Sequence, residues 1–433
     1  MPKKRNDITN IVEQYLCHSC GSCFTSCGHD SISYHTTVGG YLFPKIDYDS
    51  CTNCGLCYDI CPGDHFTDYL KNQTPEDPFV GTIISAYIGK STDEKIYKNS
   101  QSGGAVTALL KSLLESGEIS AAIVTSMNAD SSSYSEAKIV TSVEELIQAQ
   151  KSKYVPTNIT SLMQKIEKVD GTIAMVGLSC HMHGLENLLT IKRKLKNRII
   201  KIGLICDRVM TSASVDFLSK QMTNEKISDF VFRDTLNTSY PGDITVKTKQ
   251  NELKILNKKS RMLMKDFFTP ARCLLCFDKM NIYADIVIGD PHGIKGVDRI
   301  FGESLVLTRT SFGKNILDKA MSCNDIILRE TSSEVAIKGQ SIEVKRKKWN
   351  AHMNAWDELG YDMPDYPSSV ILHSQNVTRK EINIAKRNLE HAISLDSYSS
   401  REELLKDASK YYNIKLIKFN VSKVLNFIKR IIK

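Results

Sequence analysis

The pattern of apolar and polar positions changes near residue 80. Residues 1–70 have short turns and few long apolar stretches. Such a segment cannot bury a sizeable core and needs disulfides or bound metal to stabilise its fold. Residues 71–80 (KNQTPEDPFV) carry two prolines among polar residues, which is typical of a linker. We therefore predict a small head over residues 1–70, a linker over 71–80 and a larger body after it.

From residue 81 the body alternates short apolar runs with segments of helical spacing. Six runs predict buried strands, over residues 83–90, 121–126, 172–177, 201–206, 284–289 and 304–309. A Gly-rich turn and an amphipathic helix span 102–117, and Gly117 stands where a glycine often ends a helix. Residues 142–150 (SVEELIQAQ) predict another helix. Strands that alternate with helices predict a mixed α/β body, which we extend over residues 81–345.

The C-terminal part, residues 346–433, is predicted to be a helical extension. Residues 378–410 have helical spacing, with Ser400 and Glu403 placed as in a capping box. Residues 411–433 hold six Lys/Arg and no acidic residue, and their apolar positions also follow helical spacing: Ile414, Ile417, Val421, Val424, Ile428 and Ile431. Two interpretations stay open, a peripheral contact with an anionic membrane or partner, and packing on the body with a solvated basic face.

Composition and charge narrow the class of protein. The 433 residues are 41% hydrophobic and 24% charged, as in ordinary globular proteins. No apolar run approaches the roughly 18 residues of a membrane helix, and the N-terminus MPKKRND is followed by no apolar signal segment. We therefore expect a cytoplasmic protein. Peripheral contact with the inner face of the membrane, through residues 411–433, is the second expectation.

The charge is unevenly distributed. Residues 1–70 contain four Lys/Arg and eight Asp/Glu, whereas the whole chain contains 57 and 49, so an acidic head precedes a basic body. The basic residues of the body would suit the binding of a small anionic substrate. Alternatively, they only form a solvated surface. No helix-turn-helix, RNA-binding or zinc-finger signature accompanies the charge, so no nucleic-acid partner is expected.

Eight of the thirteen cysteines lie within residues 17–61. In a large chain without a secretory signal, this density indicates metal binding or redox chemistry rather than disulfides. The eight form two runs of C-x2-C-x2-C-x3-C spacing, and Pro62 follows the second. That is the spacing of bacterial two-cluster ferredoxins, in which the fourth cysteine of each run binds the other cluster.

The spacing therefore predicts two 4Fe–4S clusters with exchanged fourth ligands. The ligands of the first are Cys17, Cys20, Cys23 and Cys61, and those of the second are Cys51, Cys54, Cys57 and Cys27. Gly21 and Gly55 follow the second cysteine of each run, where the backbone must turn tightly. Zinc is the alternative, because C-x2-C pairs also build zinc sites.

Four further cysteines follow predicted strands or form another C-x2-C pair: Cys180, Cys206, Cys273 and Cys276. From spacing alone, a third 4Fe–4S cluster and ordinary buried cysteines both stay open. Cys323 has no partner in the pattern and is expected to be structural.

Taken in order, the motifs resemble the beta subunits of coenzyme F420 (deazaflavin) hydrogenases and dehydrogenases, fused to a two-cluster ferredoxin head. The resemblance runs to about residue 312 and is carried by Gln101–Gly104, Lys153–Pro156, Gly177–Cys180, Gly203–Cys206, Phe232–Asp234, Cys273–Cys276 and Ala284–Asp290. It implies an α+β ferredoxin-like two-cluster head, a mixed α/β flavin-binding body and a helical C-terminal tail.

The resemblance also implies FAD, and it favours the third cluster on the four body cysteines. Lys153 is a candidate for binding a flavin phosphate or for stabilising negative charge on the flavin ring, and a solvated lysine is the alternative. Tyr154 is a candidate for stacking on an aromatic ring, and a core tyrosine is the alternative. A helix opening with free N–H groups suits a pyrophosphate, although an ordinary helix cap has the same residues. The residues concerned, together with the turn at Gly177, are Ser102, Gly103 and Gly104.

Two positions depart from the family pattern. The family usually has Gly-Thr-Pro-Cys where this chain has Gly177–Cys180 with Leu and Ser, and His181 stands where Gln is frequent. His181 is the candidate catalytic proton donor, with His183 and His292 as weaker candidates, and a hydrogen-bonded structural histidine is the alternative. Residues 345–348 (KRKK) either contact an anionic ligand or form a solvated charge run.

The predicted function is that of an iron–sulfur flavoprotein oxidoreductase. Electrons would pass between the clusters and a flavin that exchanges hydride with a small substrate, either deazaflavin or, in bacteria, an intermediate of surface polysaccharide biosynthesis. The expected partner is an electron donor or acceptor protein, a ferredoxin or a hydrogenase or dehydrogenase subunit. The alternative is an electron-relay subunit that docks on a catalytic partner and has no substrate site of its own.

Overall fold

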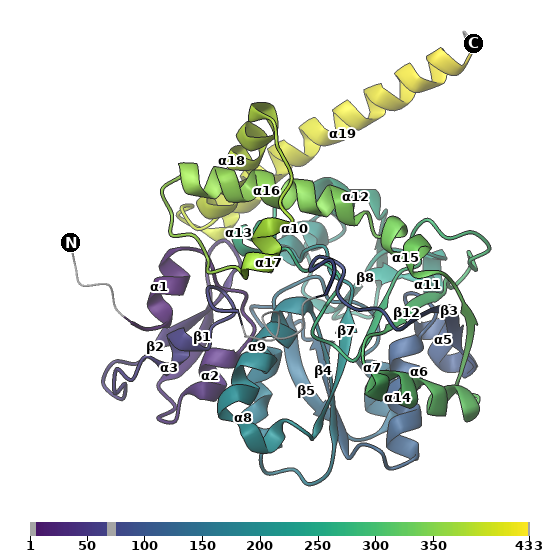
Figure 1. The fold of residues 1–433 in the computed structure, drawn as a ribbon. Coiled ribbons are helices and arrows are strands. Elements are labelled where there is room, and N and C mark those ends of the chain that lie inside the picture. Colours follow the sequence, from purple (N-terminus) through teal and green to yellow (C-terminus); the bar gives the residue numbers. More distant parts are fainter. Residues whose placement is uncertain (1–5, 67–74, 432–433) are drawn as a thin grey trace.

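The head is a small α+β unit. The structure is a computed structural model that describes residues 6–66 and 75–431, with side chains described up to residue 422. Two cysteine loops flank an antiparallel hairpin (Figure 1). The elements are α1 (Ile8–Glu13), α2 (Ser22–Ser26), β1 (Ile32–Thr36), β2 (Leu42–Ile46) and α3 (Leu56–Asp59).

The body is built on a mixed sheet. Within the described residues it has eight strands in the order β13-β3-β12-β11-β7-β6-β4-β5. The neighbours β4/β6, β6/β7 and β7/β11 pair in parallel, and the remaining pairs are antiparallel. The strands are β3 (Ser85–Ser91), β4 (Ala121–Met127), β5 (Ser135–Val140), β6 (Ile173–Gly177), β7 (Ile199–Leu204), β11 (Ile286–Gly289), β12 (Ser304–Thr308) and β13 (Ile326–Glu330).

Helices cover both faces of this sheet. Val306 of β12 packs in one core cluster with residues of α6 (Ala105–Glu115) and α14 (Ser311–Ser322). Leu305 and Leu307 pack in the other, with residues of α9 (Ser179–Ile191) and α10 (Ala213–Lys220). Strands buried on both faces have continuous apolar runs rather than alternation, which is why the central strands could be predicted from sequence.

The predicted candidate residues gather at one edge of the sheet. The parallel strands β6, β7 and β11 end there, immediately before Leu178, Ile205 and Asp290. The antiparallel strand β12 begins at the same edge, because Leu305 pairs with Gly289. Ligands of open α/β sheets bind at the carboxyl ends of the strands, so this edge is the expected location of a site.

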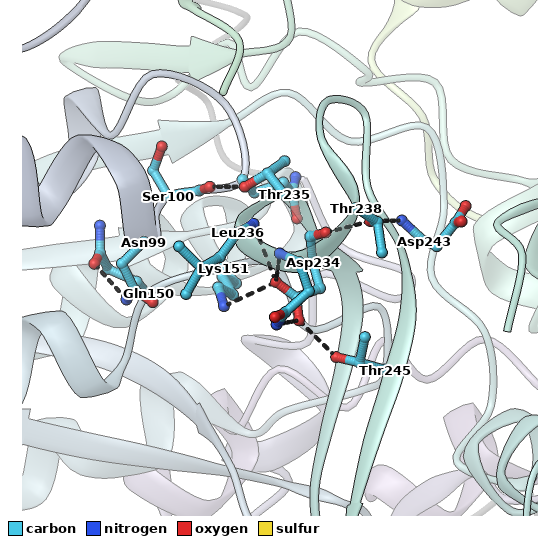
Figure 2. Close-up of polar contacts among 12 residues, drawn as sticks. Asn99, Ser100, Gln150, Lys151, Asp234, Thr235, Leu236, Thr238, Asp243 and Thr245 are labelled. Atoms are coloured by element: carbon cyan, nitrogen blue, oxygen red, sulfur yellow. Dashed lines mark hydrogen bonds and ion pairs between the residues drawn. The ribbon is translucent and has the colours of Figure 1, made fainter. Parts of the chain in front are cut away.

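A smaller antiparallel sheet is attached beside this edge. It consists of β8 (Ile227–Asp234), β9 (Asp243–Thr248) and β10 (Leu253–Leu256). Figure 2 shows how the end of β8 is fixed: the Asp234 carboxylate caps α11 (Thr235–Thr238) by accepting from Leu236 N and also accepts from Thr245 Oγ1 at 2.9 Å. The hydroxyl of Thr235 donates to the carbonyl of Ser100, so β8 is tied to the turn before α6.

The C-terminal helices pack against both head and body. Tyr41 of the head donates its hydroxyl to the carbonyl of Ala392 at 2.7 Å, and Arg401 pairs with Asp216 of α10 at 2.6 Å. The last helix projects away from the rest of the molecule (Figure 1). The helices are α15 (Ser333–Gly339), α16 (Ile342–Glu358), α17 (Ser368–Leu372), α18 (Arg379–Ser394) and α19 (Arg401–Ile431).

The remaining helices are short connections. They are α5 (Glu94–Asn99), α7 (Val143–Gln148), α8 (Met163–Ile166), α12 (Lys259–Met264) and α13 (Ala271–Leu274), with 3-10 turns η1 (Ile159–Leu162) and η2 (Arg193–Leu195). Among the helices in the described ranges, none is long and apolar enough to cross a membrane.

Most predicted elements are present with shifted ends. The six predicted strands correspond to β3, β4, β6, β7, β11 and β12. Gly117 has a φ of 71° after α6, and a capping box with Ser142 opens α7, so both of these helix signals are confirmed. The helical prediction for residues 378–410 corresponds to α18 and the start of α19, which residues 395–400 separate, and Glu403 N donates to Ser400 Oγ at 3.2 Å where α19 begins.

The predicted borders around the body are less sharp in the structure. Residues 71–74 of the linker lie outside the described residues, but the rest of it packs into the body. Phe79 is fully buried, and Asp77 pairs with Arg346 at 2.5 Å. The border predicted at residue 345 falls within α16, so the body and the extension share a helix.

Candidate iron–sulfur and flavin site

The two cysteine runs of the head fold in the same way. Ser19 and Asn53, each two residues after the first cysteine of its run, have φ values of 59° and 56°. Gly21 and Gly55 follow with φ values of 104° and 77°, and each leads directly into a short helix. The left-handed conformation favours glycine, so the repeated C-x2-C-Gly pattern yields the same loop twice.

Backbone N–H groups in these loops point at cysteine sulfurs. Ser19 N donates to Cys17 Sγ at 3.3 Å, and Asn53 N donates to Cys51 Sγ at 3.5 Å. A similar bond joins Gly63 N to Cys61 Sγ at 3.4 Å. Hydrogen bonds to sulfur are among the features that set the reduction potential of an iron–sulfur cluster.

The first predicted ligand set is brought together and buried. Burial raises the pKa of Cys61 well above its ordinary value, and the neighbouring Cys20, Cys17 and Cys23 raise it further. Burial likewise raises the pKa of Cys17 to about 12. Thiols held together in this way resist ionisation unless a cation compensates them, and binding of iron supplies that charge. The donor set fits a 4Fe–4S cluster, and we call it the inner set.

The second predicted set is nearer to solvent. Cys54 is exposed, and Cys51 and Cys57 are half-buried. Burial raises the pKa of Cys57 to about 11, with Asp7, Cys54 and Cys51 as neighbouring causes. Cys27 ends α2 and is half-buried, and its place in this set rests on the ferredoxin spacing. We call these four cysteines the outer set.

The four body cysteines also come together. Burial raises the pKa of Cys180 well above its ordinary value, and Cys206, Cys276 and Cys273 raise it further. Cys20 of the inner set contributes next, so this third set is a neighbour of the inner set. Among the side chains of residues 6–66 and 75–422, no group of three or more His, Cys, Asp or Glu is arranged to hold a single metal ion.

Cationic side chains surround the third set. Lys345 lowers the pKa of both Cys273 and Cys276 against the larger effect of burial, and Arg208 and Arg272 act in the same direction. A cluster bound by four thiolates is an anionic group, so these cations would favour its binding and its reduction. Lys345 thus lies beside the third set, whereas the next residue, Arg346, is buried on Asp77.

The inner set lies where the head packs on the body. Thr160 of η1 donates its N–H and its hydroxyl to the carbonyl of Cys20, at 2.9 and 2.7 Å. A Cβ on Gly184 of α9 would lie 3.1 Å from Cys20 Sγ, and buried Arg272 donates Nε to the carbonyl of Gly63 at 3.1 Å. These close contacts fix the inner set against the helix that carries Cys180.

A second constellation lies at the carboxyl edge of the sheet. Arg233 is 4% exposed; its Nη1 donates to Asp290 Oδ2 at 2.6 Å and to the Tyr154 hydroxyl at 3.3 Å. Its Nε donates to the carbonyl of Pro241 at 2.7 Å. Its Nη2 is buried without a hydrogen-bond partner among the described residues. The ring of Tyr240 lies against the same guanidinium, with its centroid 5.6 Å from Cζ.

Arg261 adds a second guanidinium to this constellation. Its Cζ lies 4.9 Å from the centroid of the Tyr154 ring, and its Nε is buried with no hydrogen-bond partner in the part of the chain that the structure describes. Burial lowers the pKa of Arg261, and Arg233 lowers it further. Burial alone would raise the pKa of Tyr154, but the two arginines outweigh it and lower that pKa. The local potential is therefore positive.

Comparison with known proteins identifies the family. Family models described as "Coenzyme F420 hydrogenase/dehydrogenase, beta subunit", N-term and C terminus, match residues 86–164 and 170–334. A 4Fe-4S binding domain model matches residues 43–66. The chain belongs to the family of coenzyme F420 hydrogenase/dehydrogenase beta subunits. The resemblance to this family that the sequence motifs indicated is confirmed. The segment that matches the 4Fe-4S model contains the second cysteine run.

Relatives among these beta subunits and related enzymes extend over most of the chain. One subunit of the F(420)H(2) dehydrogenase of Methanosarcina mazei is 25% identical over 80% of this chain and 93% of its own length. The coenzyme F420-dependent sulfite reductase of Methanocaldococcus jannaschii is 25% identical over 79% of this chain and 52% of its own length. A solved structure of the F420-reducing NiFe hydrogenase complex of Methanosarcina barkeri, obtained with xenon derivatization, contains a similar chain. The alignment has a TM-score of 0.47 and 20% identity, and it covers 63% of this chain and 94% of that one.

Several residues predicted to hold the flavin in this beta subunit make contacts within the protein. Ser102 donates its hydroxyl to the carbonyl of Glu303 at 2.5 Å, and Ala105 N donates to Ser304 Oγ at 3.4 Å. A Cβ on Gly103 would lie 2.6 Å from Ser304 N, and Gly104 precedes α6 with a φ of 75°. The turn fits tightly against β12, and a pyrophosphate at this point stays a prediction.

Lys153 and Tyr154 have separate environments although they are adjacent. The Lys153 ammonium donates to the carbonyls of Gln150 and Lys151, both at 2.8 Å, and to that of Ala149. Burial lowers the pKa of Lys153 to about 7. It is not a solvated lysine, and its contact with a flavin stays a prediction. Tyr154 instead belongs to the arginine constellation described above.

The structure gives His181 a structural environment. It is 4% exposed, and its Nδ1 accepts the N–H of Leu178 at 3.1 Å. Burial lowers the pKa of His181 to about 4, so the ring is neutral near pH 7 and offers no acidic proton. His183 is buried against Asp278, with 3.0 Å between Nε2 and Oδ2. The alternative of hydrogen-bonded structural histidines fits the contacts of both residues, and the catalytic role of His181 stays a prediction.

Sequence reasoning missed that Arg233 pairs with Asp290 and that Arg261 lies near both. Arg233 and Asp290 lie in short family motifs, but 57 residues separate them, and Arg261 lies in no motif. The position of these residues at strand ends was the one sign of a shared site, since Arg233 lies at the end of β8 and Asp290 directly follows β11. Gly177, which ends β6, accepts from Asn281 Nδ2 through its carbonyl at 2.9 Å and lies at the same edge.

Proposed function

We propose that this chain is an iron–sulfur flavoprotein oxidoreductase with a chain of three 4Fe–4S clusters. Electrons would be exchanged with a partner protein at the outer set, pass through the inner set to the third set, and reach FAD at the carboxyl edge of the sheet. The observation that carries the proposal is the gradient of burial: exposed Cys54 in the outer set, a fully buried inner set, and Cys20 next to Cys180.

When bound, the clusters carry single electrons and the flavin couples them to two-electron hydride transfer. The residues of this chain position and insulate these groups. The inner set is closed off by Thr160, Gly184 and Arg272 at the contact of head and body. Lys345 supplies positive charge beside the third set. The constellation of Tyr154 and Arg233 offers polar groups at the sheet edge.

The substrate we propose is a small anionic molecule. The relatives are named for their use of coenzyme F420, so deazaflavin is the first candidate. In a bacterium, an intermediate of surface polysaccharide biosynthesis is the other. The excess of basic residues outside the acidic head supports an anionic substrate of either kind.

The test is anaerobic purification with iron, sulfide, zinc and flavin quantified together. We expect about twelve iron per chain and one FAD, because each cubane holds four iron. About eight iron without flavin would reduce the chain to a ferredoxin head on a relay body. Zinc in place of iron would overturn the redox function, and FMN in place of FAD would correct the cofactor.

The second candidate function is a relay subunit without its own substrate site. It is favoured by the exposed apolar side chains of Ile414, Ile417 and Val421 on the projecting α19. These side chains offer a docking surface for a catalytic partner or for an anionic membrane. Deleting residues 411–433 separates the candidates: turnover of the isolated protein would persist if it is an enzyme, and only activity in a reconstituted complex would fall if it is a relay.

A further inference from the structure

We propose that Arg233 and Arg261 form a binding site for an anionic group, a phosphate or a carboxylate, of the ligand that occupies the carboxyl edge of the sheet. The inference rests on the proposed function, because it assigns a recognition role within the same site. It adds two ligand-binding residues that the sequence motifs did not designate.

The unpaired donors carry the argument. Arg233 is almost fully buried, and two of its nitrogens are satisfied by Pro241, Asp290 and Tyr154. Its third nitrogen, Nη2, and the Nε of Arg261 are buried without partners in the described part of the chain. Buried guanidinium donors are rarely left unpaired in a native protein, and each requires an acceptor.

The balance of charge identifies the acceptor as an anion. The Asp290 carboxylate, which lies 2.6 Å from Arg233 Nη1, compensates one guanidinium. The second guanidinium, above the Tyr154 ring, makes the site cationic. Guanidinium groups bind phosphates and carboxylates through paired N–H donors, and they do so most strongly where water is excluded.

The constellation reaches the surface at His292. The side chain of His292 is 57% exposed and lies 3.9 Å from Asp290 Oδ2. On the other side, the sheet edge continues to the end of β6 at Gly177, next to the helix that carries Cys180. A ligand whose anionic group reaches the two arginines would therefore enter from the side of His292.

Two sources of the anionic group are consistent with this chemistry. It belongs either to the phosphates of the flavin or to the substrate that meets the flavin. Both give the same contact with the arginines, and binding measurements distinguish them, because riboflavin has the flavin ring without phosphate.

The experiment uses the full-length protein purified anaerobically, in flavin-free and FAD-loaded forms. The variants are Arg261→Gln and Arg233→Lys, the second of which keeps a cation where loss of the buried charge could impair folding. The matched control is Arg379→Gln, which removes an arginine that is 66% exposed on α18 and pairs with Glu358. Flavin fluorescence measures the Kd of FAD, FMN and riboflavin, and calorimetry measures the Kd of pyrophosphate.

If the group is a flavin phosphate, the Kd of FAD and FMN rises about tenfold in Arg261→Gln and that of riboflavin does not, as expected for one charged hydrogen-bonding partner. If it belongs to the substrate, flavin affinities stay unchanged, and pyrophosphate binding to the FAD-loaded protein weakens by a similar factor. The proposal is overturned if neither ligand responds more in Arg261→Gln and Arg233→Lys than in the control. A wild-type protein that binds no flavin contradicts the proposed function, while pyrophosphate binding to it still tests the arginines.

Discussion

The two cysteine runs of the head have the same spacing and the same loop conformation but opposite surroundings. The first run lies against η1 and α9 of the body, and the second lies toward solvent with Cys54 exposed. The comparison shows that the cysteine spacing determines the loop conformation. The neighbouring elements determine which cluster site is exposed to a partner protein and which is buried in the interior.

The largest expected difference is between Gly21→Ala and Gly55→Ala. A Cβ on Gly21 would lie 2.5 Å from Ser161 N and 2.7 Å from Asn158 O, whereas a Cβ on Gly55 would lie 3.2 Å from Asn6 O. Both substitutions have the cost of a positive φ, about 1–2 kcal/mol, and Gly21→Ala adds an overlap of up to about 3 kcal/mol. We expect Gly21→Ala to lose iron and to lower the urea midpoint strongly.

Iron content and the urea midpoint of cluster absorbance measure this difference. Gly55→Ala should retain the wild-type iron content and lose only a little stability. Equal losses in the two variants would show that the body does not distinguish the two loops.

Removal of metal should also separate the two sets. A chelator such as EDTA, added to the oxidised protein, reaches an exposed thiolate ligand sooner than a buried one. We expect the outer cluster to be lost first, because Cys54 is exposed and the inner thiols are buried. Iron release followed with EPR of the reduced samples measures the order, and loss of the inner signal first would contradict the assignment.

Charge beside the third set should shift its reduction potential. Lys345→Met removes a cation that acts on Cys273 and Cys276, so the potential should fall by roughly 50 mV. Lys347→Met on the same helix is the matched control, since Lys347 pairs with Glu381 at 2.8 Å. A redox titration followed by EPR measures both, and an equal shift in the two variants would disprove the local effect of Lys345.

The smallest effect concerns one hydrogen bond to sulfur. The hydroxyl of Tyr34 lies 3.4 Å from Cys23 Sγ in the inner set, whereas that of Tyr58 in the second run donates to Asp64 at 2.9 Å. Removing a donor to a cluster thiolate should lower the potential of the inner cluster, by roughly 20 mV in Tyr34→Phe. Tyr58→Phe should leave both head potentials unchanged, and the same EPR titration compares the two variants.

Local patterns in the sequence were sufficient for much of the fold. The continuous apolar run at 121–126 predicted β4 to within one residue at its C-terminal end, because both faces of that strand are buried. The sheet of β8, β9 and β10 was not predicted, since its strands are partly exposed and polar residues interrupt their apolar positions. The spacing of apolar residues did not mark the end of α18 at Ser394, whereas the pair of Ser400 and Glu403 did mark the start of α19.

The candidate site was predictable only where chemistry follows spacing. The third cysteine set could be proposed because Cys180 and Cys206 follow strands that end at one sheet edge. The proximity of Cys20 to Cys180 depends on how the head packs on α9, and no sequence pattern expresses it. The hydrogen bond from Leu178 N to His181 Nδ1 likewise could not be read from the sequence, and the role of His181 as a proton donor stays a prediction.

The central claim is that electrons reach the flavin through the outer and inner sets. The most direct measurement is stopped-flow bleaching of the flavin after mixing with a reduced ferredoxin, in wild type and in Cys54→Ser. We predict rapid bleaching in the wild type and its loss in Cys54→Ser, with FAD content unchanged. Bleaching at the wild-type rate in Cys54→Ser would show that electrons reach the flavin by another route and would contradict the account.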